Sequence, residues 1–407
     1  MQLSLGPFFI CLTVLCTFLV TYTNAEKIVT SNSPLSVIAS ASNSFGIDFL
    51  KRLLQEKTGN IICSPLSVNI VLAMAAYGAR GNTGFQIRQT LTLPEEDAIG
   101  QSGYESLITS LNDIKTVDLQ IANKIFVAKK FEVNPDYTAI TKDIFHSECE
   151  TVDVSNPTAA AATINSWCAN NTNNRIKDLL TPDDIDNRTK LVLINAIYFK
   201  GKWKDSFDGK YTSDLPFHIN SNTIKEVPMM TITSMYLHGQ LHNLDARFVE
   251  LPYKGDEVSM FIIVPNKIDG LQRIENNIHD LDFSRLNQYG RNEEVILFVP
   301  KFKIENTIEL NNLLQKVGMA EMFTDAADFS GIADTPLKVS KILQKGFIEV
   351  NEEGSEAVAA SAFLVRPASA DAVYKPVIQV DRPFLYAIVD SRYKSILFYG
   401  RIQDPTL

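Results

Sequence analysis

The sequence has few of the residues that enzymes commonly use for catalysis or for binding metals. Its 407 residues include only five His and five Cys. It contains no G-x-S-x-G nucleophile elbow, no C-x-x-C pair and no G-x-x-x-x-G-K-[ST] phosphate loop. An active site would have to form from scattered residues that no motif indicates. We therefore expect a protein that is not an enzyme and that binds neither a metal nor a cofactor.

Two patterns resemble binding motifs but lack a required feature. His238 and His242 have the spacing of a zinc-binding H-E-x-x-H helix, yet Gly239 replaces the Glu that serves as general base. Three glycines within residues 78–84 have the wrong spacing for a dinucleotide-binding loop, and they follow an apolar helical run instead of a strand. We expect no metal at the first pattern and a turn at the second.

Basic residues are too few to suggest a nucleic-acid partner. The chain has 38 Lys and Arg against 47 Asp and Glu, a formal net charge of -9. Phosphate binding is driven by clustered positive charge, so we expect neither nucleic acid nor an anionic membrane as a partner. With 45% hydrophobic and 21% charged residues and no Pro/Gly/Ser-rich linker, the chain reads as one globular domain, which we expect to be a monomer.

The N-terminus carries an apolar block that is typical of secretion. The run PFFICLTVLCTFLV is too short to span a bilayer, and small residues follow it, with Thr23 and Ala25 at the positions that signal peptidase requires before Glu26. We predict a signal peptide over residues 1–25. The mature protein, residues 26–407, is then expected to be secreted and extracellular.

Secretion would also affect the cysteines and two asparagines. Cys63, Cys149 and Cys168 remain after removal of the signal peptide, and this odd number excludes a disulfide framework. At most one bridge can form, between Cys149 and Cys168; the alternative is three buried free thiols. Asn170 and Asn187 begin N-x-T sequons and are predicted glycosylation sites on exposed turns.

Hydrophobic patterns predict a mixed α+β fold. Helices are expected where apolar residues recur at helical spacing between capping residues: 45–54, 65–77, 157–170 and 307–317. Continuous apolar runs predict strands covered on both faces: 190–199, 258–265, 295–302 and 341–350. Two further strands near the C-terminus are joined by the short polar turn SRYK.

A segment of small residues follows the last of these buried strands. If residues 355–363 were extended, one face would carry Ser355, Ala357, Ala359, Ser361 and Phe363. A face that is almost uniformly small suits a strand that must enter between two existing strands without clashing with what lies beneath. A flexible linker would not need alanine, although the helical propensity of EAVAASAFL permits a helix before insertion.

Several motifs, taken together, resemble those of the serpin family. They are Asn60-IICSPLSV, Gly78-AR-Gly81-NT, Leu193-INAIYFKGKW, Val299-PKF, Phe347-IEVNEEGSEAVAAS and Val380-DRPFLYAI. The resemblance covers essentially all of residues 26–407, and the chain looks most similar to secreted arthropod members of the family.

The resemblance implies both a fold and a mechanism. The implied fold is α+β, with three β-sheets, a central five-stranded sheet A, about eight to nine helices and an exposed reactive loop over about residues 352–376. The implied activity is irreversible suicide-substrate inhibition of an extracellular serine protease, in which the cleaved loop inserts into sheet A while the enzyme is still acylated. Roughly fourteen inserted residues at about 3.3 Å each span about 45 Å, comparable with a small protease.

The resemblance also assigns roles to residues. The hinge of the inserting loop comprises Glu352, Glu353, Gly354, Ser355, Glu356, Ala357, Val358, Ala359, Ala360 and Ser361. The shutter beneath sheet A and the breach at its top comprise Ser64, Ser67, Asn195, Gln344, Trp203 and Lys301. Gln344 stands where the family usually has histidine, so hydrogen bonding is kept while titration is lost. Glu352 is expected to pair with Lys301, worth about 0 to 1 kcal/mol if exposed.

The bond that the protease cleaves has several candidates. In order of preference they are Ala368–Ser369, Ala370–Asp371 and Arg366–Pro367, with cleavage after Phe363, Leu364 or Val365 as a further alternative. The first follows the family's usual spacing from the hinge, and the second follows from counting back from the DRPF motif. The third would attract a trypsin-like enzyme, but a proline after the cut makes a poor substrate. A small residue before the cut favours an elastase-like target.

A non-inhibitory serpin, acting as a carrier or storage protein, is the alternative function. Such a protein would usually carry proline or charge on the small face of the hinge, and this sequence has neither there. Acidic residues occupy the stretch where heparin-activated relatives carry Lys and Arg: Glu95, Glu96, Asp97 and Glu105. Heparin activation at that position is therefore not expected.

Overall fold

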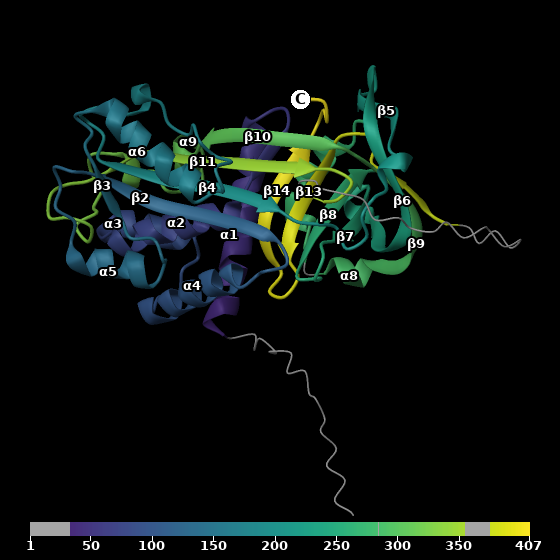
Figure 1. Cartoon of the computed structure of the whole chain (residues 1–407). Helices are drawn as coiled ribbons and strands as arrows, with labels where there is room; N and C mark the ends of the chain where they lie inside the picture. The colour runs from purple at the N-terminus through teal and green to yellow at the C-terminus, as the bar shows by residue number, and fades with distance from the viewer. Residues whose placement is uncertain (1–32, 284, 355–374) are drawn as a thin grey trace, which may run out of the picture.

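The computed structural model describes residues 33–283, 285–354 and 375–407, which form nine α-helices and two hydrogen-bonded β-sheets (Figure 1). The fold is α+β, as the sequence predicted. The predicted signal peptide (1–25), the predicted hinge over 355–361 and every candidate scissile bond lie outside the described residues. Within the described part of the chain, no helix has the length and apolarity needed to cross a membrane.

Four helices begin with the same local arrangement, a capping side chain followed by proline. The side-chain oxygen accepts a hydrogen bond from a first-turn amide, and proline occupies the next position, where no amide donor is needed. These helices follow Ser33, Ser64, Asn134 and Asn156: α1 (Pro34–Glu56), α2 (Pro65–Gly78), α5 (Pro135–Asp143) and α6 (Pro157–Asn170). The others are α3 (Gly81–Thr90), α4 (Asp97–Asn112), α7 (Leu271–Asn276), α8 (Leu286–Tyr289) and α9 (Asn311–Lys316).

Five strands form the central sheet that the resemblance implied. In their order across the sheet they are β10 (Phe302–Glu309), β11 (Val339–Val350), β4 (Leu191–Lys200), β2 (Asp118–Ala128) and β3 (Glu150–Val152). β11 and β4 are parallel neighbours at the centre, whereas β10 is antiparallel to β11 and β2 is antiparallel to β4. The short β3 pairs in parallel with one end of β2.

Helices cover both faces of the central sheet (Figure 1). Every residue of α2 is buried, and the helix packs against β2 and β4. This agrees with its sequence, which is apolar almost all round and predicts an interior helix. α6 lies on the opposite face, where Trp167 packs edge to face on Phe126 of β2 with ring centroids 5.7 Å apart.

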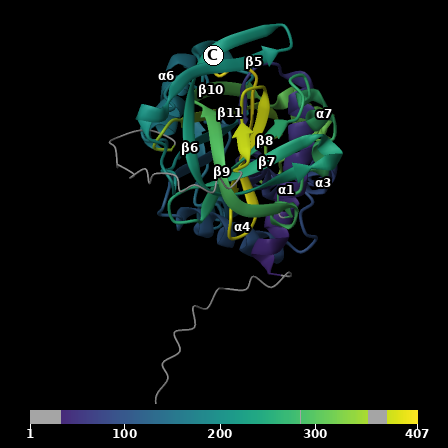
Figure 2. The ribbon, with the colours of Figure 1, turned by 90° about the vertical axis from the view of Figure 1, so that its right-hand side faces the viewer.

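The remaining strands form one continuous hydrogen-bonded sheet. Its order is β1 (Ile61–Cys63), β14 (Ser395–Ile402), β13 (Phe384–Asp390), β8 (Val258–Pro265), β7 (Ala246–Pro252), β6 (Thr223–Leu241), β9 (Gly290–Pro300) and β12 (Val377–Gln379), with β5 (Ser213–Asn220) paired to β6. The 19-residue β6 pairs with β7 near one end and with β9 and β5 elsewhere along its length. Two of the three expected sheets are thereby joined, and Figure 2 views this assembly from the end where β6 and β9 lie.

Two sequence-based boundaries are wrong. The run 295–302, expected as one strand, is divided: β9 ends at Pro300 and β10 begins at Phe302, because the chain leaves one sheet and enters the other at Lys301. The helix expected from Thr307 begins one turn later. Thr307 instead pairs with Lys345 of β11, so ladder hydrogen bonds extend β10 to Glu309 before α9 starts.

In the described part of the chain the cysteines are Cys63, Cys149 and Cys168, and all three are free thiols, so no bridge joins Cys149 to Cys168. Cys63 and Cys168 are buried and Cys149 is half-buried. Burial raises the pKa of Cys168 to about 12, which keeps its thiol protonated and unreactive at neutral pH.

Candidate functional site

The parallel pair at the centre of the sheet is the first component of the site. β11 and β4 pair from Val339 opposite Leu191 to Phe347 opposite Tyr198, and we call this interface the seam. Residues 351–354 follow β11 directly, and the next described residue is 375. Residues 351–354 therefore lie at one end of the seam, beside both of its strands.

Polar side chains meet under the seam in an otherwise apolar core. Gln344 of β11 lies opposite Asn195 of β4, which lies opposite Asn123 of β2. Ser64 and Ser67, at the start of α2, lie beneath this row. We call these five residues the polar cluster, and each is at most 7% exposed.

The polar cluster is joined by hydrogen bonds that tie α2 to three strands. The Gln344 amide nitrogen donates to Asn195 Oδ1 (2.6 Å) and to the Ser64 carbonyl (2.9 Å), and its oxygen accepts from the Ser64 amide (3.0 Å). Asn195 donates to Ser67 Oγ and to Asn123 Oδ1, and Ser67 Oγ donates to Asn123 Oδ1 at 3.1 Å. Because these side chains are buried away from water, removing one of them leaves the others without a hydrogen-bond partner. We expect this to cost about 1–3 kcal/mol of folding stability.

Sequence reasoning placed four members of the polar cluster by family resemblance but missed Asn123. Its neighbours at alternate positions, Ile121 and Ile125, are apolar, and Asn123 shares their face of β2. A polar residue on the apolar face of a predicted strand is the signal in the sequence that could have identified Asn123 as a member of the polar cluster.

The second component is a tight turn of residues 351–354, which we call the hinge turn. The Asn351 amide donates to the Gly354 carbonyl (2.9 Å), and the Gly354 amide donates back to the Asn351 carbonyl (3.2 Å). Gly354 has φ +142°, and a Cβ there would lie 1.9 Å from the Gly201 carbonyl oxygen. Only glycine can occupy this position, because both the backbone conformation and the close approach exclude a side chain.

Trp203 holds the hinge turn against the end of β4. Its indole nitrogen donates to the Asn351 carbonyl at 3.0 Å, and its backbone amide donates to the Glu353 carbonyl at 2.8 Å. The indole ring stacks on Tyr253, with centroids 4.5 Å apart and planes inclined by 16°. The Phe207 amide adds a further bond to the Glu352 carbonyl at 2.8 Å.

The Glu352 side chain adds a charged contact to the hinge turn. Lys301 Nζ lies 2.9 Å from Glu352 Oε2, and the Thr212 hydroxyl donates to Oε1 at 2.9 Å. Burial by itself would raise the pKa of Glu352, but the hydrogen bond from Lys301, a hydrogen bond from the backbone of Glu352 and the hydrogen bond from Thr212 together outweigh this and lower the pKa overall. The carboxylate is therefore ionised at neutral pH and holds the turn to the strand connection at Lys301.

The structure places both sequon asparagines at the surface. Asn170 is the last residue of α6, and Asn187 lies in the turn before β4; both are exposed. Their threonines are buried. The Thr172 hydroxyl donates to the Cys168 carbonyl at 2.7 Å and accepts from the Ile176 amide at 3.1 Å.

The His238 and His242 pattern has no zinc-site geometry. His238 lies on β6 and not on a helix, and its Nε2 is 2.8 Å from Glu293 Oε1. Across the ranges that the structure describes, no group of three or more His, Cys, Asp or Glu side chains could hold a metal ion.

The structure combines a central sheet whose two middle strands are paired, the polar cluster beneath that pair and the anchored hinge turn that precedes a long connection. These features define a class of protein, and comparisons with known proteins identify it. Residues 40–405 match the family described as Serpin (serine protease inhibitor). The chain therefore belongs to the serpin family.

Relatives agree over nearly the full length. Alaserpin of Manduca sexta is 36% identical over 374 residues, covering 91% of this chain and 94% of that protein. The crystal structure of Serpin48, described as a highly specific serpin in the insect Tenebrio molitor, aligns with TM-score 0.82 and 33% identity over 90% of this chain and 98% of that one. Human thyroxine-binding globulin complexed with thyroxine aligns with TM-score 0.83 and 30% identity over 91% and 99%.

The polar cluster yields a stability prediction. Gln344→Leu removes one acceptor and two donated bonds, leaving the Ser64 backbone groups and Asn195 Oδ1 without these partners inside the core. We expect the uncleaved protein to lose about 2–4 kcal/mol of unfolding free energy, measured by urea denaturation. Gln89→Leu, at an exposed position of α3, is the control and should change little. Equal midpoints for the two variants would contradict the assignment.

The Glu352–Lys301 pair yields a pH prediction. The folded-state pKa of Glu352 lies below its unfolded value, so the pair stabilises the uncleaved fold above the ordinary glutamate pKa of about 4.3 and loses this effect as pH falls through the lower folded value. Glu352→Gln should lower the melting temperature at pH 7 by about 1–2 °C. The difference from wild type should shrink as the pH falls below the ordinary glutamate pKa and disappear once the pH lies below the lower folded-state pKa. A difference that is independent of pH would exclude the ion pair as its cause.

Proposed function

We propose that the protein is an irreversible suicide-substrate inhibitor of an extracellular serine protease. The protease cleaves the loop that follows the hinge turn, and the residues after Gly354 then enter the seam as a new strand. The observation that carries the proposal is the parallel pairing of β4 with β11. A chain that reverses direction after β11 runs antiparallel to both strands and can pair with both.

Two bridges at Gly354 support a specific register for the new strand. Gly354 already bridges Lys202, beyond the end of β4, and Asn351, beyond the end of β11, in antiparallel fashion. If both ladders continue without interruption, Ser361 comes opposite Asn195 on one side and opposite Gln344 on the other. These two residues are themselves opposite each other across the seam, so both ladders give the same register.

This register explains why the inward-facing residues of the hinge are small. Asn195 and Gln344 face α2, so Ser361 and its alternate residues Ala357 and Ala359 would face α2 as well. Little space is available there, because α2 is buried throughout. The Ser361 hydroxyl would lie between Asn195 and Gln344 and replace the direct bond between them.

Insertion exchanges one ladder for two. A new strand would increase the spacing of β4 and β11 from about 4.8 Å to about 9.6 Å, which breaks the Gln344–Asn195 bond. One parallel ladder is lost and two antiparallel ladders are gained, and antiparallel pairing is slightly more stable per residue. The added pairing and burial would supply the driving force.

The remaining features of the proposal rest on sequence. Ala368–Ser369 is our first choice for the cleaved bond, which favours an elastase-like protease; Ala370–Asp371 and Arg366–Pro367 are the alternatives. We further propose that residues 1–25 direct secretion and that Asn170 and Asn187 carry glycans. The acidic stretch around α4 supports inhibition without heparin.

A non-inhibitory carrier is the second candidate, favoured by the structural similarity to thyroxine-binding globulin. Incubation with elastase-, chymotrypsin- and trypsin-like enzymes separates the two. An inhibitor gives a complex that survives denaturant and releases a C-terminal peptide whose first residue identifies the cleaved bond. Cleavage without any complex, and with unchanged melting temperature of the cleaved protein, would refute inhibition by insertion.

Ala357→Arg tests the direction of the hinge side chains. An arginine facing α2 should block insertion, so we expect at least a tenfold loss of stable complex while the loop is still cleaved. Glu356→Arg introduces the same side chain on the outward face and should retain complex formation. The yield of complex is measured by denaturing gel electrophoresis. Similar yields for the two variants would show that the proposed faces are misassigned.

Ser361→Val tests the register itself. Loss of the hydroxyl should leave Asn195 and Gln344 poorly satisfied only after insertion, at a cost of about 1–3 kcal/mol. The guanidinium midpoint of the cleaved protein should therefore fall while that of the uncleaved protein stays unchanged. Ser361→Thr keeps a hydroxyl and should preserve both midpoints. If Ser361→Val leaves the cleaved form unaltered, Ser361 does not reach the polar cluster.

A further inference from the structure

Strand β9 carries apolar side chains on a face that water reaches. Val295, Leu297 and Val299 are buried, so the residues between them point to the opposite face of the sheet. Two of these, Ile296 and Phe298, are only half-buried. A sheet face that meets water normally carries polar residues, so large apolar side chains on it indicate a contact that covers them.

The strands on both sides of β9 extend this apolar face. Val377 of β12 lies opposite Ile296, and Met235 of β6 lies opposite Glu294, two residues before Ile296. Val377 is 44% exposed and Met235 is 57% exposed. We call Met235, Ile296, Phe298 and Val377 the outer patch. It lies at the end of the molecule that Figure 2 views, where β6 and β9 run side by side.

A small pocket adjoins the outer patch. Its volume is about 240 Å³, and its apolar walls come from Leu215, Pro216, Met229 and Phe298, the last of which also belongs to the outer patch. Sites for small molecules are usually larger, roughly 300 to 1,000 Å³. The pocket therefore suits a single apolar side chain better than a separate ligand.

The connection over residues 355–374 starts and ends beside β9. At its start, the hinge turn is held through Glu352 to Lys301, the residue directly after β9. At its end, Lys375 Nζ lies 2.9 Å from Glu294 Oε2. The outer patch falls between these two points along β9, so the connection has to pass this region.

The connection contains a run of bulky apolar residues that can reach the outer patch. This run is Phe-Leu-Val at residues 363–365, and it begins nine residues after Gly354. Nine extended residues reach about 30 Å. The stretch of β9 from Glu294 to Lys301 is only about 23 Å long by the same measure. The length of the connection therefore permits the run to lie on the outer patch.

We propose that residues 363–365 dock on the outer patch in the uncleaved protein, with Phe363 in the adjoining pocket. The inference rests on the proposed function, since it concerns which bonds of the loop a protease can reach. Docking buries apolar surface on both partners and withdraws the bonds after residues 363–365, because proteases cut exposed chain. The bonds beyond them, Ala368–Ser369 included, stay accessible. The outer patch thus favours cleavage after small residues over cleavage after bulky apolar ones.

Trace amounts of a chymotrypsin-like protease test the docking on the uncleaved full chain. Such an enzyme prefers a bulky apolar residue before the cut, and mass spectrometry of the early fragments gives the rate at each bond. Met235→Glu and Val377→Glu each place a charge in the outer patch at an exposed position. We expect cleavage after Phe363 and Leu364 to become about three- to tenfold faster than in wild type, since cleavage follows the population of undocked loop.

Ile224→Glu is the matched control. Ile224 is also an apolar residue of β6 and is 56% exposed, but it lies outside the outer patch. Its cleavage rates should equal those of wild type. Equal rates after Phe363 and Leu364 in wild type and all three variants, including no cleavage at all, would overturn the docking.

Two further outcomes separate the docking from its alternatives. A wild-type dimer in sedimentation velocity that Met235→Glu dissociates would assign the outer patch to a second copy of the chain and overturn the docking. Cleavage of wild type by every enzyme without a stable complex would overturn the proposed function instead. The docking is then still decided, because the cleavage rates report it without any trapping of the protease.

Discussion

The arrangement of this molecule depends on one pairing constraint: two adjacent strands that run in the same direction, next to a chain that reverses. β4 and β11 pair along the seam and satisfy each other's backbone hydrogen-bonding groups, so no gap is left between them. The hinge turn reverses the chain beside both strands, and Gly354 bridges Lys202 and Asn351 in antiparallel fashion. In the proposed function, the strand that enlarges the sheet would begin there.

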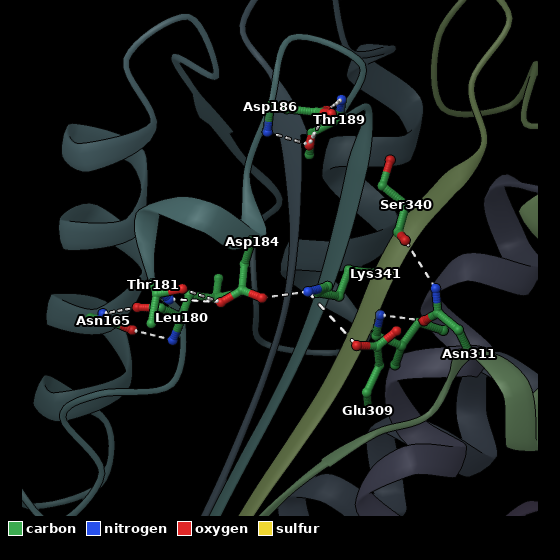
Figure 3. A network of polar contacts seen from close by, with 11 residues as sticks. Asn165, Leu180, Thr181, Asp184, Asp186, Thr189, Glu309, Asn311, Ser340 and Lys341 are labelled. Atoms are coloured by element: carbon green, nitrogen blue, oxygen red, sulfur yellow. Dashed lines mark hydrogen bonds and ion pairs between the residues drawn. The ribbon is translucent and has the colours of Figure 1, made fainter.

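Contacts on the two faces of the central sheet hold β4 and β11 together. Below the strands, Gln344 joins Asn195 and the start of α2 in a fully satisfied network. Above them, Lys341 Nζ lies 2.5 Å from Asp184 Oδ1 in the connection between α6 and β4 (Figure 3). Glutamine at position 344 donates and accepts without a change of charge, so the contact below does not respond to pH through this side chain. The two faces therefore differ in character: the contacts below are neutral and buried, and the contact above is ionic and partly exposed.

Much of the fold could be predicted from the sequence because its local and global preferences agree. The Ser64–Pro65 cap and an all-round apolar run predict the interior helix α2, and apolar runs predict β4, β8 and β11. Boundaries failed where tertiary context decides, as at Lys301, where the chain changes sheets. Asn123 needed a strand register to reveal it, and the Lys341–Asp184 pair joins residues 157 positions apart, which no local pattern can indicate.

The buried sequon threonine has a consequence for biosynthesis. Attachment of a sugar to asparagine requires the threonine two residues later to be accessible, but in the folded chain the Thr172 hydroxyl is already engaged with Cys168 and Ile176. If Asn170 carries a glycan, as we propose, the transferase would have to reach it before the end of α6 folds. The fraction of molecules that carry a glycan at Asn170 would then report how often transfer precedes folding of the end of α6 during synthesis.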